Sequence, residues 1–265
     1  MRHARFMNRS YSAEIRRSAI ALLRDHVPNI EVARRLGIPP GTIGAWKHED
    51  SCVHGHLPPR RICPLCDNNL DILDRSSYSY LLGLYLGDGH IVRYKQWRVY
   101  ALTIACADAW PGLIDAAEAA VRAVLPHNKV GRVQRQGCTS VKGYSRHWPC
   151  LFPQHGPGRK HLRPIVLAEW QAAIVQEHPR EFIRGLIHSD GCRVMNWATR
   201  LVAGEMKRYE YPRYLFVNES DDIRKLYTDA LDILGIEWRR NKRNCISVAK
   251  RGSVAAMDTF VGPKY

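Results

Sequence analysis

The sequence predicts an α/β (α+β) fold made of two copies of one unit, each with the element order α-β-β-α-β-β-α. Three observations predict it: a nine-residue stretch occurs twice, similar helices and strands follow each copy, and the copies lie one full unit apart. The stretches are "LLGLYLGDG" at residues 81–89 and "IRGLIHSDG" at residues 183–191. A small all-α domain and a short metal-binding segment precede them, so the predicted divisions are residues 1–50, 51–75, 76–177 and 178–265.

Each repeated stretch is predicted to be the end of a helix. Both stop at Asp-Gly, where we expect the glycine to take the left-handed conformation that ends a helix. Gly83 and Gly87 are four residues apart, as are Gly185 and Ser189. Each helix therefore carries a row of small residues along which another backbone can approach closely.

An aspartate stands in the last turn of each of these helices, namely Asp88 and Asp190. The helix dipole is already negative there, so these carboxylates are badly placed for stability alone. If the two helices pack along their small-residue rows, both aspartates emerge at the same end of one interface. They can then share a divalent metal.

The charge balance points to a polyanionic partner. Lysines and arginines number 40 against 25 aspartates and glutamates, a net charge of +15, and nucleic acid is the usual partner of so basic a chain. A ribosome-bound or merely basic protein is the alternative. No apolar run approaches the roughly 20 residues that span a bilayer, and the start lacks the apolar core of a signal peptide. We therefore expect no membrane association and an intracellular location, nucleoid-associated if the source is bacterial.

The first fifty residues predict three short helices. One begins after Ser12, a second runs from Asn29 to Gly37, and a third covers residues 39–50. The layout resembles the helix-turn-helix domains of bacterial regulators and transposases, and a helical bundle used for protein contacts is the alternative. The expected recognition helix carries Thr42, Ala45, Trp46 and Lys47.

A group of metal-binding residue types follows in "CVHGHLPPRRICPLC". Cys63 and Cys66 form a CxxC knuckle, and Cys52 with His54 or His56 lies just upstream. We predict a structural zinc held by Cys52, His56, Cys63 and Cys66, with His54 as the alternative histidine and free thiols or a redox pair as the alternative reading. The eight cysteines are otherwise scattered, as in a reducing compartment.

The remaining elements follow in the same order in both units. The first unit has two strands within residues 90–107, a helix at 111–126, strands within 129–152 and a helix at 165–179. The second has strands within 193–218, a helix after Ser220, strands within 237–250 and a last helix at 252–262.

From about Ser76 to Tyr265 the sequence resembles the LAGLIDADG homing endonuclease family in its single-chain, two-repeat form. The two motifs in order, one unit apart, each followed by strands, carry the resemblance. It implies two four-stranded antiparallel sheets that form a saddle in the DNA major groove, with the motif helices at a pseudo-twofold interface inside a monomer. It further implies that Asp88 and Asp190 bind magnesium beneath the scissile phosphates, with short 3′ overhangs as the product.

The resemblance also implies roles for residues near the metals. Gly87 and Ser189 match positions whose backbone carbonyls line the metal site. Family members use a lysine or glutamine to order solvent, and the candidates are Lys250 in the second unit and Lys160 in the first, with Lys142 as the alternative. Ordinary phosphate-contacting or solvated lysines are the competing interpretation.

Basic residues on the predicted strands are the candidates for DNA contacts, because alternate strand residues face the groove. They are Arg93, Arg98, Arg132, Arg135, Lys207, Arg208, Arg239, Arg240 and Arg243.

Two functions remain open at this point, besides an RNA maturase that uses the same saddle, which no feature of the sequence specifically supports. The first is a site-specific, metal-dependent double-strand DNA endonuclease, and the second is a DNA-binding transcription regulator that has kept the fold without cleavage. Retention of both Asp88 and Asp190 favours the endonuclease, because binding alone gives no chemical reason to keep two clustered carboxylates opposite a phosphate backbone. His188 and Leu86 depart from the acidic residue usual two positions before each aspartate, and we expect them to alter packing rather than metal binding. Arg184 is expected to face solvent or the flanking strand.

Overall fold

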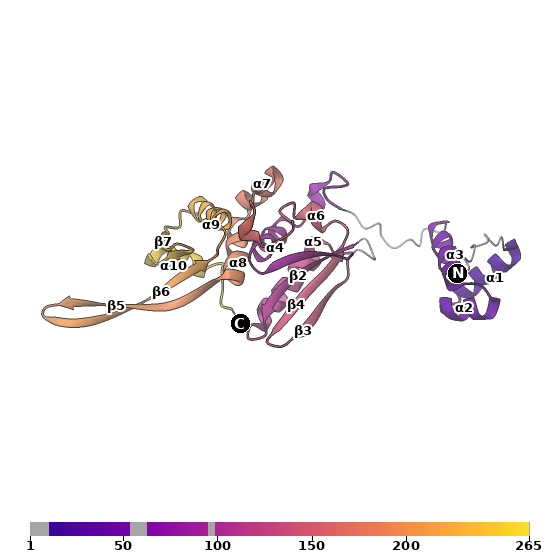
Figure 1. Ribbon diagram of the computed structural model, residues 1–265, viewed down its shortest axis with the longest axis horizontal. Helices are drawn as coiled ribbons and strands as arrows, with labels where there is room; N and C mark the ends of the chain where they lie inside the picture. Colours follow the sequence, from indigo (N-terminus) through magenta and orange to yellow (C-terminus); the bar gives the residue numbers. More distant parts are fainter. Residues whose placement is uncertain (1–10, 54–62, 95–98, 265) are drawn as a thin grey trace, which may run out of the picture. The chain divides into compact units, whose positions relative to one another are not determined.

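The computed structural model describes residues 11–53, 63–94 and 99–264. The chain divides into two compact units, Met1–Arg60 and Arg61–Tyr265 (Figure 1). The predicted α/β architecture is confirmed by the elements described below.

Between residues 11 and 53, the first unit contains three helices. They are α1 (Ala13–Arg24), α2 (Asn29–Leu36) and α3 (Pro40–Val53). The Ser12 hydroxyl accepts a hydrogen bond from the Ile15 backbone N–H and begins α1, while Gly37, with φ of 62°, ends α2 in the left-handed conformation. Their shared core consists of Ala19, Leu23, Val32, Ala33, Ile38, Ile43 and Trp46.

The second unit contains the two repeats. A 3₁₀ turn, η1 (Leu70–Ile72), precedes them. The first repeat comprises α4 (Arg75–Gly87), β1 (Gly89–Tyr94), β2 (Val99–Ala107), α5 (Pro111–Val124), β3 (Val130–Arg135), β4 (Cys138–Ser145), α6 (Trp148–Leu151), η3 (Lys160–Leu162) and α7 (Glu169–Glu177). The second comprises α8 (Pro179–Asp190), β5 (Gly191–Val202), β6 (Glu205–Val217), α9 (Asp221–Ile233), β7 (Arg239–Lys242), β8 (Cys245–Val248) and α10 (Arg251–Asp258).

The described strands form two antiparallel four-stranded sheets of the same topology. Their orders are β1-β2-β4-β3 and β5-β6-β8-β7, so the internal repeat predicted from the sequence is confirmed. Helices cover one face of each sheet (Figure 1). Leu102 and Val141 point into the core below α5, and the Phe216 ring packs 4.4 Å from the ring of Tyr227 on α9.

The short helix α6 lies where strand was expected. His147 precedes it as the N-cap, and Pro149 stands in its first turn, where its missing N–H costs nothing. Trp148, Leu151 and Phe152 are completely buried here. The side chains of this segment therefore pack into the core of the first repeat, and the segment does not extend the sheet.

The helices α4 and α8 pack directly against each other between the two repeats. A Cβ atom added at Gly83 would lie 2.5 Å from the Phe182 carbonyl oxygen and 2.9 Å from the Cα atom of Gly185. Neither position can hold a side chain without separating the helices. The predicted close approach along the small-residue rows is confirmed.

The glycines that follow the motif aspartates do not have the conformation expected for them. Gly191 is extended, with φ of −116°, and Gly89 is not among the residues with positive φ. Their need for glycine is steric, because a Cβ at Gly89 would lie 2.5 Å from the Cα of Tyr85 and one at Gly191 2.8 Å from the Cα of Ile187. Each strand thus turns back closely over the last turn of its own helix.

In the described segments, no helix combines the length and the apolar character needed to cross a bilayer.

Candidate functional site

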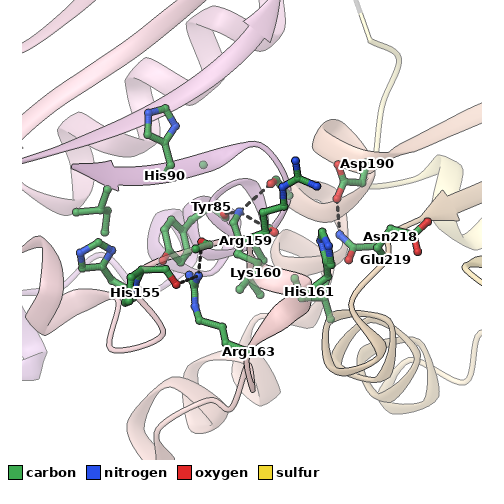
Figure 2. Close-up of a pocket in the computed structure, with 18 of the residues that line it drawn as sticks. Tyr85, His90, His155, Arg159, Lys160, His161, Arg163, Asp190, Asn218 and Glu219 are labelled. Atoms are coloured by element: carbon green, nitrogen blue, oxygen red, sulfur yellow. Dashed lines mark hydrogen bonds between the residues drawn. The ribbon is translucent and has the colours of Figure 1, made fainter.

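The two motif aspartates lie at one end of the α4–α8 interface. Asp88 directly follows α4, and Asp190 is the last residue of α8. A Cβ at Gly87 would lie 3.1 Å from Asp190 Oδ2, which shows how closely the helix ends meet. Asp190 Oδ2 accepts a 2.6 Å hydrogen bond from Asn218 Nδ2 (Figure 2). Among the described residues, no side chain or backbone group donates a hydrogen bond to the Asp88 carboxylate.

The electrostatics of this pair favour a bound cation. Partial burial, and then the neighbouring charge of Asp190, raise the pKa of Asp88 to about 6, although Lys160 and Lys264 oppose the rise. Burial also raises the pKa of Asp190, against the hydrogen bond from Asn218. Two partly buried carboxylates that lie close together, each with an oxygen atom that accepts no hydrogen bond from a described residue, are a suitable ligand set for a hard divalent ion such as Mg²⁺.

Two lysines bind the backbone at the ends of the motif helices. Lys160 Nζ donates to the carbonyl oxygens of Leu86 at 2.9 Å and Gly87 at 2.8 Å, and also to that of Tyr85. Lys264 Nζ donates to the Gly191 carbonyl oxygen at 2.6 Å. Each cation lies at the negative end of a helix dipole. Burial lowers the pKa of Lys160 to about 8 and lowers that of Lys264 as well.

The structure corrects the lysine expected in the second unit. Lys250 forms an exposed ion pair with Glu237, while Lys160 and Lys264 are the lysines whose charges act on both aspartates. Lys264 follows Lys160 by nearly the same interval that separates Asp190 from Asp88. That interval was the signal by which the sequence could have identified it.

The small residues before the aspartates hold the helix ends in place. The Gly87 carbonyl, expected to line the metal site, accepts the hydrogen bond from Lys160. The Ser189 hydroxyl donates to the carbonyls of Gly185 at 3.1 Å and Leu186 at 3.0 Å, which keeps it inside the α8 turn.

A cavity of about 1050 Å³ opens beside Asp190 between β1, residues 155–163 and residues 217–219 (Figure 2). Arg163 closes the loop on one side by donating to the Gly158 carbonyl at 2.7 Å and the Pro157 carbonyl at 3.3 Å. The lining includes four positively charged side chains, Arg93, Arg159, Lys160 and Arg163, and three histidines, His90, His155 and His161. Positive side chains beside the Asp190 carboxylate suit an anionic group that shares a metal with it.

Register decides which basic residues of the first sheet lie on the face that helices leave open. Lys142 pairs with Thr103 and Gly131, so it shares the open face with Arg135. Arg132 pairs with Val141 of the core, and its guanidinium donates at 2.6 Å to both Glu118 and Asp115 of α5.

Arg93, paired with Tyr100, is likewise on the helix-covered face, two residues after the core residue Ile91. The prediction that Arg93 and Arg132 face the groove is therefore wrong, because their positions in the strands turn them towards the helices. Arg98 lies outside the described residues.

The basic residues of the second sheet are likewise divided between its open face and its helix-covered face. Lys207 pairs with Arg200, and Arg239 with Ser247, on the face opposite Phe216. Arg200 was not among the sequence candidates.

Three other candidates in the second sheet are turned away from its open face or engaged elsewhere. Arg208 lies on the same face of β6 as Phe216, and its guanidinium lies over the Trp197 ring, 5.1 Å from the ring centroid. Arg240 approaches Asp221 of α9 at 3.7 Å, and Arg243 pairs with Glu219 at 2.6 Å. All three side chains remain exposed, so their contacts with DNA stay a prediction.

A second group of metal-ligand side chains lies in the first repeat. Cys63, Cys66, His147 and Cys150 each offer one ligand atom, and these atoms all lie within 4.8 Å of one another. Cys63 and Cys66 were predicted as ligands. His147 and Cys150 were not, although His-x-x-Cys is a ligand spacing, because more than 80 residues separate them from the knuckle. His54, His56 and the side chain of Cys52 lie outside the described residues.

In the first unit the expected recognition helix is α3. Lys47 is exposed and Thr42 half-buried, so their DNA contacts stay a prediction. Trp46 is only 9% exposed, and its ring meets that of Tyr11 edge to face at 5.5 Å. Its assignment as a DNA-contacting residue is corrected, because the indole belongs to the core of the unit.

His188 is a buried packing residue. Its Nδ1 lies 2.9 Å from the Tyr80 hydroxyl and its Nε2 3.0 Å from the Val261 carbonyl oxygen, so Nε2 donates and Nδ1 accepts. Burial lowers the pKa of His188 to about 4, which keeps it neutral. The neighbouring Arg184 is half-buried and lies over the Tyr80 ring.

Comparisons with known proteins concern both units. A family model for a transposase helix-turn-helix domain matches residues 7–70. A search of curated proteins finds no match. Similar solved structures include mesophilic variants of the homing endonuclease I-DmoI, at 16% identity and a TM-score of 0.47 over 71% of this chain and 91% of that chain.

Further similar structures are complexes with DNA. I-DmoI with DNA and Mn is 14% identical, with a TM-score of 0.45 over 72% of this chain and 99% of that chain. The LAGLIDADG meganuclease I-AabMI bound to uncleaved DNA is 14% identical, with a TM-score of 0.43 over 69% of this chain and 82% of that chain.

Proposed function

We propose that this chain is a site-specific, divalent-metal-dependent double-strand DNA endonuclease, and that residues 76–265 belong to the LAGLIDADG homing endonuclease family. The observation that carries the proposal is the meeting of Asp88 and Asp190 at one end of the α4–α8 interface. The two helices pack so closely at Gly83 and Gly185 that a Cβ does not fit, and they end in two carboxylates that lie close together. Stability alone does not explain that arrangement.

The chemistry of phosphodiester hydrolysis suits this site. A divalent ion held by the two carboxylates supplies an activated water and neutralises charge on the phosphate. Asp88 and Asp190 would hold the ion, while Asn218 orients the Asp190 carboxylate through its 2.6 Å hydrogen bond. Lys160 and Lys264 bind the helix ends and so fix the backbone from which each aspartate projects. No nucleophilic side chain is needed.

The open faces of the two sheets support double-stranded DNA as the substrate. Arg135, Lys142, Arg200, Lys207 and Arg239 lie on those faces by strand register. Antiparallel strands can enter the major groove, where arginine and lysine bind guanine edges or phosphates. The helix-turn-helix unit adds a second contact with the same partner.

One chain contains both halves of the site, so we propose that a monomer is the active species. We also propose an intracellular location, nucleoid-associated if the source is bacterial.

The test uses the full-length chain with a library of randomised DNA duplexes and Mg²⁺, followed by sequencing of the DNA ends. We expect breaks at a defined sequence that need Mg²⁺ and disappear in Asp88→Asn and in Asp190→Asn. Asp229→Asn is the matched control, because Asp229 is a solvent-facing carboxylate paired with Lys225 on α9. It should leave cleavage unchanged.

Specific binding of a duplex by the native protein, with no breaks at any Mg²⁺ concentration, would overturn the proposal. That outcome would instead identify the chain as a DNA-binding transcription regulator with the same fold.

A further inference from the structure

We propose that Cys63, Cys66, His147 and Cys150 bind one structural zinc ion, which joins the segment before α4 to the α6 region of the first repeat. This site is separate from the aspartates and does not depend on the proposed nuclease activity. It also differs from the ligand set that the sequence alone predicts, because His147 and Cys150 take the places assigned to Cys52 and His56.

The distances between ligand atoms match a tetrahedral zinc. Zn–S bonds of about 2.3 Å and Zn–N bonds of about 2.0 Å place two sulfurs about 3.8 Å apart and a sulfur and a nitrogen about 3.5 Å apart in a tetrahedron. Cys66 Sγ lies 3.6 Å from Cys150 Sγ and 3.4 Å from His147 Nδ1. Three thiolates and one imidazole complete four-coordination and leave no open position, as in structural rather than catalytic zinc sites.

The local backbone is already shaped for the ion on both sides. In the knuckle, the Cys66 N–H points at Cys63 Sγ at 3.5 Å, and Asn68, with φ of 49°, turns the chain back. On the other side, Cys150 N–H donates to the His147 carbonyl at 3.0 Å across one helical turn. That turn brings His147 and Cys150 to the same side of α6.

The ion secures a segment with little regular structure of its own. Residues 63–74 contain only turns and η1, and their apolar anchors are Leu65, Leu70 and Leu73. Fixing such a segment costs conformational entropy that so few buried side chains recover only in part. A metal that binds only the folded arrangement supplies the remaining free energy needed to order the segment.

The site also supports the helix that carries Asp88. His147 and Cys150 flank Trp148, whose ring packs 5.9 Å from that of Phe152. The Phe152 ring in turn lies 4.5 Å from the ring of Tyr85, in the last turn of α4. Loss of zinc should therefore loosen the core beneath this helix end.

The experiment measures zinc in the full-length protein purified under reducing conditions without added metal. We expect one zinc per chain in the native protein and in Cys52→Ser and His56→Asn, and loss of zinc in Cys63→Ser and Cys150→Ser. Cys138→Ser is the matched control, because this half-buried cysteine lies outside the cluster. Loss of zinc in Cys52→Ser with retention in Cys150→Ser would overturn the proposal.

A second measurement needs no variant and so does not depend on whether a variant folds. Zinc should protect Cys63, Cys66 and Cys150 of the native protein from alkylation, while exposed Cys192 reacts with or without the ion. Chelation should lower the melting temperature, and added Zn²⁺ but not Mg²⁺ should restore it. Zinc well below one per chain, or a disulfide between Cys66 and Cys150 in the reduced preparation, would refute the assignment.

Discussion

Replacing Gly83 by alanine tests the contact on which the candidate metal site depends. The new Cβ would lie 2.5 Å from the Phe182 carbonyl oxygen and 2.8 Å from the Leu186 nitrogen. Both are backbone atoms, so relief requires the helices to separate by roughly 0.8 Å, given normal contacts of about 3.3 Å. Overpacking of this kind costs up to about 3 kcal/mol, and the better helix propensity of alanine returns about 1 kcal/mol.

We therefore expect Gly83→Ala to lose about 2 kcal/mol, which lowers the melting temperature of a unit of this size by about 4–8 °C. The separation also moves Asp88 away from Asp190, so the increase in melting temperature on adding Mg²⁺ should shrink. Thermal denaturation followed by circular dichroism, with and without Mg²⁺, measures both effects.

The matched control is Gly252→Ala in α10, where a Cβ meets no atom within 4 Å. That variant should be neutral or more stable by up to about 1 kcal/mol. If Gly83→Ala melts as high as Gly252→Ala and responds equally to Mg²⁺, the helices do not approach as described, and the argument for a shared metal fails.

Three further predictions concern charge and packing. The pKa of Asp88 is raised from 3.8 to about 6 on folding, so its contribution to the stability of the metal-free protein should be lost as the pH rises from about 4 to about 6. Carboxylates with lowered pKa values, such as Glu118 and Asp258, act in the opposite direction, so the melting temperature is compared with that of Asp88→Asn, and a difference that does not change with pH contradicts the prediction. Mg²⁺ affinity should fall below about pH 6 as protons compete, which melting curves with and without Mg²⁺ check. Lys160→Met should raise the pKa of Asp88 further, because the charge that opposes the rise is gone, whereas Lys250→Met should leave it unchanged; carboxyl ¹³C NMR titration distinguishes these results. Trp46→Ala should cost the first unit about 3–5 kcal/mol and unfold it without altering the melting of the second unit, and retention of its helical NMR signals would show that the indole is not a core residue.

The repeat and its helix contact were predictable because they depend on local rules. Glycine four residues from another small residue predicts close packing, and Ser12 and Ser220 cap the helices they precede. The aspartates meet at the helix ends because they occupy equivalent places in the two repeats.

Features that depend on contacts distant in the sequence were not predictable in the same way. His147 and Cys150 join the knuckle only because α6 folds back beside it. Gly89 was assigned a turn conformation, whereas the close approach to Tyr85 is what requires glycine there. The faces occupied by Arg93 and Arg132 follow from register, and a shift of one residue would reverse both assignments.

The differences between the two repeats have a consequence for the proposed DNA target. Strands β5 and β6, with 12 and 13 residues, extend beyond β7 and β8 (Figure 1). A twofold homodimer requires a palindromic sequence, because its two halves are identical. Under the proposed function the two half-sites need not match, since one chain supplies both halves and their strands carry different residues. Each half of the chain can therefore change its specificity without a compensating change in the other.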